Sequence, residues 1–156
     1  MFFGLFDSKS DKKDKLVPQY DISTIEVLEQ DHRKLLYYLE SIEAAMMQGT
    51  LGTGVVKNSL KYFRMHLLEH FMEEDIKIYQ YMKSYYKYDH STYKLIESYE
   101  ESIKVIHKNV VEFFEYYSQD DVPLDDEYRE KFKHIFQELV YRISLEEQQL
   151  YKLYRP

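Results

Sequence analysis

The stretch KYFRMHLLEHFMEEDIKIYQY, residues 61–81, decides the fold of this chain. Its apolar residues recur at helical spacing, and no Pro or Gly interrupts it. His70 and Glu74 lie on the apolar face, one turn apart, so their side chains can bind the same metal ion or adjacent ions. An ionisable group facing a core is costly unless it is paired or ligated. The apolar positions of this face are Leu60, Phe63, Leu67, Phe71 and Ile78.

Composition favours a helical bundle of one domain. The chain has 156 residues with only 4 Gly and 3 Pro, and 44% of its residues are hydrophobic. It contains no Cys, which excludes disulfides, thiolate ligands and a thiol nucleophile. The net charge of −7 argues against nucleic acid as a main partner. No apolar run approaches the roughly 18 residues of a transmembrane segment.

Residues 1–21 are predicted to form a flexible tail, and residues 22–156 the folded domain. A signal peptide would have its positive charges before a longer apolar segment, so we expect a cytoplasmic protein. Two interpretations of the tail stay open. It is either disordered, or it docks onto a protein partner, a second copy of the chain or a membrane surface through Phe2, Phe3, Leu5 and Phe6.

Four long helices are expected, at about residues 23–48, from 53 to the low eighties, 91–118, and from the turn at Pro123 to about 154. Ser23 is the expected N-cap of the first helix. Short connections between long helices imply antiparallel neighbours. The sequence therefore predicts an all-α, up-down-up-down four-helix bundle.

Polar residues interrupt the inward face of each helix. His32 and His107 stand where Leu is expected, and Arg142 and Glu146 face inward from the last helix. A faint internal repeat aligns His32 with His107 and pairs His70 and Glu74 with Arg142 and Glu146. A single inward His is usually a hydrogen-bonded core residue, but three on three helices indicate a metal site. The predicted ligands, which suit iron, manganese or zinc, are His32, His70, Glu74, His107 and Glu146.

A second pair on the last helix has the same spacing. His134 and Glu138 repeat the His-x-x-x-Glu pattern, but His134 points about 120° away from the centre of the apolar face. These two residues are kept as the alternative ligands from this helix.

Four short motifs resemble those of the hemerythrin-like (HHE cation-binding) family. They are LEQDHRKLL around His32, HFMEEDIKIYQYM around His70, VIHKNVVEFF around His107 and ISLEEQQLY around Glu146, and together they cover about residues 22–154. The resemblance implies a four-helix bundle with a non-haem di-iron centre. Members of the family carry oxygen, sense oxygen or iron, or repair iron–sulfur centres damaged by nitric oxide, which implies a diatomic gas as a second partner.

The chain departs from the family pattern at Arg142, where the fourth helix normally has a His. A guanidinium offers no lone pair to a metal and repels a nearby cation. One hypothesis is a depleted or mononuclear centre that holds iron or another divalent transition metal. The other is a metal-free helical interaction or regulatory module with a polar core. The sequence shows neither a phosphate-binding loop nor a nucleophile with its base, so nothing in it indicates hydrolase or transferase chemistry.

Overall fold

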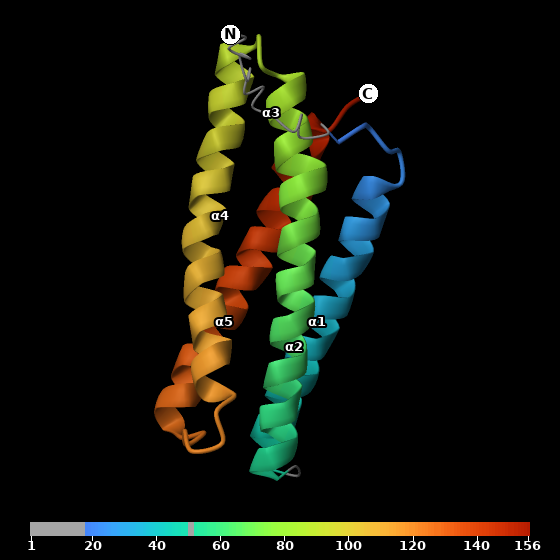
Figure 1. Cartoon of the computed structure of the whole chain (residues 1–156). Helices are drawn as coiled ribbons and strands as arrows, with labels where there is room; N and C mark the ends of the chain where they lie inside the picture. The colour runs from blue at the N-terminus through green and yellow to red at the C-terminus, as the bar shows by residue number, and fades with distance from the viewer. Residues whose placement is uncertain (1–17, 50–51) are drawn as a thin grey trace, which may run out of the picture.

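The computed structural model describes residues 18–49 and 52–156, and Phe2, Phe3, Leu5 and Phe6 of the predicted tail lie outside this part. Four long rods run alternately up and down the molecule, as the sequence predicts (Figure 1). The first is α1 (Thr24–Gln48) and the third is α4 (His90–Tyr117). The second rod joins α2 (Thr53–Glu74), the π-helix η1 (Asp75–Gln80) and α3 (Tyr81–Tyr85). The fourth joins α5 (Asp126–Leu145), the π-helix η2 (Glu146–Leu150) and the 3-10 turn η3 (Tyr151–Leu153).

The rods form a closed ring. Helix α1 packs against α2 and α5, and α4 packs against α2 and α5. The described residues contain no strand, so the prediction of an all-α antiparallel four-helix bundle is confirmed. No helix in this part of the chain is both long and apolar enough to cross a membrane.

Aspartate side chains cap the N-termini of two of the helices. Asp89 accepts a hydrogen bond from the Thr92 amide at the start of α4, and Asp125 accepts one from the Tyr128 amide at the start of α5. Ser23 occupies the predicted N-cap position of α1, but its hydroxyl donates to the Asp21 carboxylate and caps no amide. Helix α1 ends at Gly49, whose φ of 60° suits glycine.

The residues just before α1 are held against the bundle. Tyr20 stacks on Tyr154 with ring centroids 4.8 Å apart, and the Asp21 amide donates to the Tyr154 hydroxyl. Tyr20 and Asp21, which the sequence assigns to the tail, therefore contact the folded bundle.

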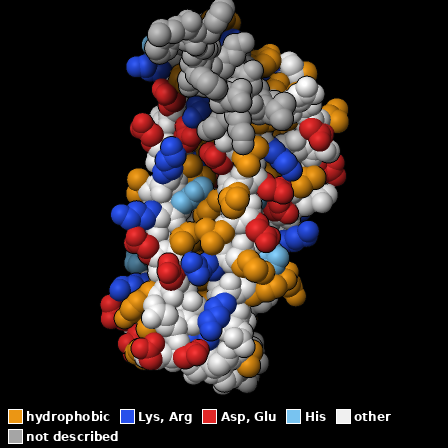
Figure 2. Space-filling view, viewed as in Figure 1, with side chains coloured by type: hydrophobic (Ala, Val, Ile, Leu, Met, Phe, Trp, Pro, Cys, Tyr) orange, Lys and Arg blue, Asp and Glu red, His pale blue; other side chains and the backbone are white. Residues whose placement is uncertain are grey.

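The hydrophobic core is divided in two along the bundle axis. The cluster nearer the α1–α2 and α4–α5 connections includes Leu39, Phe63 and Phe114, and the cluster nearer the α3–α4 connection includes Leu28 and Ile96. On each of α1, α2 and the fourth rod, buried polar residues separate the apolar residues of one cluster from those of the other. The outer surface is charged, with a strip of hydrophobic side chains on the face shown in Figure 2.

Candidate metal centre

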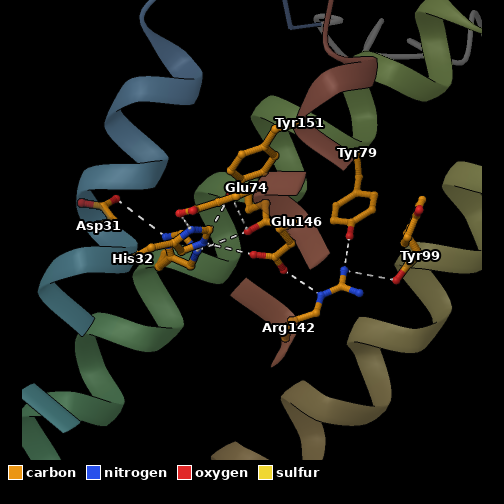
Figure 3. A network of polar contacts seen from close by, with 10 residues as sticks. Asp31, His32, Glu74, Tyr79, Tyr99, Arg142, Glu146 and Tyr151 are labelled. Atoms are coloured by element: carbon orange, nitrogen blue, oxygen red, sulfur yellow. Dashed lines mark hydrogen bonds and ion pairs between the residues drawn. The ribbon is translucent and has the colours of Figure 1, made fainter. Parts of the chain in front are cut away.

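Four buried side chains from three rods meet between the two core clusters. They are His32 of α1, His70 and Glu74 of α2, and Glu146 at the start of η2, none more than 5% exposed (Figure 3). One ligand atom from each of the four lies within 4.8 Å of every other. The heptad-like spacing explains this meeting, because residues one or two turns apart share a helix face.

The two imidazoles turn the same nitrogen towards this centre. The Nε2 atoms of His32 and His70 are 3.1 Å apart. Glu146 Oε2 lies 3.0 Å from His32 Nε2, and Glu74 Oε2 lies 3.2 Å from His70 Nε2. Two nitrogens and two carboxylate oxygens therefore surround one point, a mixed donor set that suits a first-row transition metal.

A second carboxylate lies on the far side of each imidazole. Glu147 Oε1 is 2.8 Å from His32 Nδ1, and Asp31 Oδ2 is 3.7 Å from His70 Nδ1. Metal-bound histidines commonly turn their other nitrogen to a carboxylate, which fixes the tautomer and orients the ring. Sequence reasoning missed both residues, because neither lies on the apolar face of its helix. Their positions in the sequence, next to the predicted ligands His32 and Glu146, are the signal that could have found them.

Arg142 faces inward, as predicted, and forms a buried ion pair within this centre. Its Nε donates to Glu146 Oε1 at 2.7 Å, while its Nη2 donates to the Tyr79 hydroxyl and, at 3.3 Å, to the Tyr99 carbonyl oxygen (Figure 3). Each oxygen of Glu146 thus has its own partner, the imidazole of His32 on one side and the guanidinium on the other. The internal repeat aligns Arg142 with His70. The guanidinium therefore stands where the second pair of helices would be expected to have an imidazole.

The two π-helices each bring a tyrosine into the centre. Tyr79 follows Glu74 by five residues across η1, and Tyr151 follows Glu146 by five residues at the end of η2. The Tyr151 hydroxyl lies 3.3 Å from His32 Nε2 and donates to Glu74 Oε2 at 3.4 Å. Uninterrupted α-helices were expected here. In an α-helix, residues five apart point about 140° away from each other, so helical periodicity does not direct Tyr79 or Tyr151 towards this centre.

Charge is distributed unevenly among these residues. Burial raises the pKa of Glu74 to about 7, and the nearby Glu146 carboxylate acts in the same direction. Burial also acts to raise the pKa of Glu146, but His32 and Arg142 hold it below its ordinary value. Burial opposes protonation of His32, yet its contacts with Glu146 and Glu147 raise its pKa. The metal-free centre is therefore rich in negative charge and draws protons to itself.

His107 does not join the four residues, contrary to the prediction that three imidazoles converge. It is half-buried at the edge of the inward face of α4, and its ring stacks on Phe71 with centroids 3.3 Å apart. Its Nε2 atom is buried without a hydrogen-bond partner. His107 thus takes part in aromatic stacking between α2 and α4.

The alternative pair on the fourth rod lies elsewhere. His134 and Glu138 are exposed and line a surface pocket between α4 and α5. They are away from the four-residue group, which contains Glu146 as its contribution from that rod.

Residues 23–154 match the family described as the hemerythrin HHE cation-binding domain. The chain belongs to this family. Neither the curated proteins nor the solved structures compared with the chain include a significant match. The hemerythrin-like resemblance of the four sequence motifs is thereby confirmed over nearly the whole bundle.

The residues present in this hemerythrin-like chain fit a cation. Glu74 Oε1 and His70 Nδ1 are buried without a hydrogen-bond partner, although they belong to the residues surrounding the centre. Among the carboxylates of Glu74, Glu146 and Glu147, that of Glu146 pairs with the Arg142 guanidinium, whereas those of Glu74 and Glu147 contact imidazoles. A divalent ion would balance this negative charge. It would also bind lone pairs of the carboxylate oxygens and imidazole nitrogens that have no hydrogen-bond donor. The adjoining cavity, of about 10 Å³, has room for about one water molecule.

Proposed function

We propose that this chain is a non-haem iron protein whose centre holds one iron ion through His32, His70, Glu74 and Glu146. The observation that carries the proposal is the convergence of two imidazole nitrogens and two carboxylate oxygens within 4.8 Å of one another in the core of a hemerythrin-family bundle. Glu147 would orient the imidazole of His32, and iron would supply Lewis acidity and one-electron redox chemistry when bound.

Arg142 favours one ion over two. It bonds to Glu146 Oε1, which leaves that oxygen unable to bridge a second ion without giving up its ion pair. A guanidinium is always charged and offers no lone pair, so it excludes a cation from its own position. His107 is left out of the proposed ligand set because its ring stacks on Phe71.

The role we propose is sensing or handling of oxygen, nitric oxide or iron, rather than reversible oxygen storage. With two imidazoles in the proposed set, the centre is poorer in nitrogen ligands than the sites of the family's oxygen carriers. The adjoining cavity of about 10 Å³ limits an exogenous ligand to a very small molecule. A stable and reversible oxygenated absorption spectrum would contradict this preference.

The ligand set is tested by metal retention after identical anaerobic reconstitution with Fe²⁺ and gel filtration. We expect His70→Ala and Glu146→Ala to lose most of the bound iron, because each removes one of four donors. His134→Ala is the matched control on an exposed site and should retain as much iron as the wild type. Retained iron in the first two variants together with loss in the control would move the site to His134 and Glu138.

One observation favours the metal-free alternative. The Glu146 carboxylate already accepts from Arg142 and contacts His32, so half of the centre is satisfied by protein groups alone. A helical interaction or regulatory module would need only this polar core. Its signature would be a protein that retains no iron and whose melting temperature is unchanged by added Fe²⁺, Mn²⁺ or Zn²⁺.

A further inference from the structure

A surface pocket of about 330 Å³ lies directly outside the proposed metal centre, between α1 and α2. Three carboxylates line it, those of Asp31, Glu69 and Glu73, together with two imidazoles, those of His66 and His70. Acidic side chains beside a histidine are visible on the right of the face in Figure 2, where α1 and α2 lie. We refer to this hollow as the α1–α2 pocket.

His70 belongs both to the four-residue centre and to the lining of the α1–α2 pocket. The Nε2 atom of His70 faces the centre, 3.2 Å from Glu74 Oε2, while the same residue lines the pocket. The residue is only 5% exposed, and its Nδ1 has no hydrogen-bond partner. The nearest acidic atom is Asp31 Oδ2, at 3.7 Å, which is too far for a hydrogen bond. A buried nitrogen lone pair or N–H without a partner is costly, and here it faces a carboxylate that lines the pocket.

From this arrangement we propose that the α1–α2 pocket is a loading site, where a divalent transition-metal ion is held transiently before it reaches the centre. Asp31 and the exposed Glu69 and Glu73 supply oxygen ligands, and His66 supplies a nitrogen ligand at the rim. The proposal rests on the proposed function, because it needs a centre that accepts the ion.

Positive charges also face this pocket and set the size of the expected effect. Lys34 lines it, and Lys77 forms an ion pair with Glu73 at 3.2 Å. The excess of carboxylates over positive charges is therefore small. We expect the pocket to hold cations that have already reached it more than to attract them from a distance. Such an effect appears in the rate of loading and weakens with ionic strength.

The test follows Co²⁺ binding to metal-free protein by its visible absorption in a stopped-flow instrument at low salt. The variant Glu69→Gln/Glu73→Gln keeps the size of both side chains and leaves the four proposed ligands untouched. We expect about tenfold slower loading, within the range for electrostatic effects on association. The final amount of bound Co²⁺ should equal that of the wild type, and the difference in rate should shrink at high salt.

The control is a second pair of glutamates on a comparable pocket. Glu112 and Glu138 line the pocket between α4 and α5 together with a histidine and a lysine, so Glu112→Gln/Glu138→Gln removes the same charge elsewhere. It should load at the wild-type rate. Equal rates for both double variants, or slowing in the control alone, would overturn the loading site while leaving the centre intact. A wild-type protein that retains no Co²⁺ would overturn the proposed function, and the loading site with it.

Discussion

Arg142 brings a buried positive charge into contact with Glu146 of the centre. It is 2% exposed and bonds Glu146, the Tyr79 hydroxyl and the Tyr99 carbonyl, so it ties the fourth rod to the second and third. Removing one partner of a buried ion pair leaves the other charge uncompensated. The guanidinium is therefore a structural cation as well as an obstacle to a second metal.

We expect Arg142→Met to lower the free energy of unfolding of the metal-free protein by about 3–5 kcal/mol, the usual cost of breaking a buried pair. Urea unfolding in the presence of a chelator measures this. Bound Fe²⁺ should recover part of the loss, since the ion would compensate Glu146. A loss below about 1 kcal/mol, typical of exposed pairs, would mean that the buried pair adds little to stability.

His107 gives the fold a dependence on pH. Burial against the bundle lowers its pKa from 6.5 to about 3. As the pH falls below 6.5, the unfolded chain therefore binds a proton that the folded chain still refuses, and stability falls by up to about 1.4 kcal/mol per pH unit. This contribution is complete above pH 6.5 and is lost progressively towards pH 3.

The variant His107→Phe should remove that part of the slope, because a phenyl ring keeps the stacking on Phe71 and does not titrate. Urea unfolding of metal-free protein between about pH 6.5 and pH 5 should give a shallower fall in stability than the wild type shows, by about one proton. His134→Gln, at an exposed position, is the control. An unchanged slope in His107→Phe would mean that the ring is protonated in the folded protein.

At the scale of the helices, the two π segments distinguish this bundle from a plain one. Each adjoins a carboxylate of the centre, with η1 following Glu74 and η2 beginning at Glu146. π-helical turns are rare and often occur at functional sites. Here they turn Tyr79 and Tyr151 towards the polar residues, and Tyr151 bridges His32 and Glu74.

These segments should be the part of the bundle most affected by metal. We expect amide hydrogens in residues 75–80 and 146–150 to exchange measurably faster in the metal-free protein than after iron binding, because the ion would fix Glu74 and Glu146 at their ends. Hydrogen–deuterium exchange with mass spectrometry, with and without Fe²⁺, gives the comparison. Residues 56–67 of α2, which pack into the apolar core, serve as the internal reference. Equal changes in all three segments would contradict a local effect.

The helices also show how far the sequence could be interpreted. The heptad-like faces located the four rods and the inward positions of His32, His70, Glu74 and Glu146, because periodicity reports which side of a helix faces the core. It failed at His107, which lies at the edge of that face and stacks on Phe71. Tyr151 could not be predicted, because the π turn shifts its direction relative to Glu146. Asp31 and Glu147 depend on how neighbouring helices are rotated, which one sequence does not specify.

For the whole molecule, the polar centre interrupts an otherwise continuous hydrophobic core. The two apolar clusters on either side supply the burial that holds the bundle together, and the centre holds α1, α2 and the fourth rod at one level. Because the clusters enclose it, the polar group is kept from water, which strengthens every charge interaction within it. The bundle therefore has the stability to keep a costly polar site, and that site is where a hemerythrin-family function would be exerted.

The most direct test of the account is the number of iron ions per chain in the wild type and in Arg142→His, reconstituted and desalted identically. The wild type should retain about one ion, and the variant should approach about two, the number of a carboxylate-bridged pair. The substitution removes the fixed positive charge and adds an imidazole one turn from Glu146. Iron-free wild-type protein, or equal stoichiometry in the two proteins, would contradict a one-metal centre governed by Arg142.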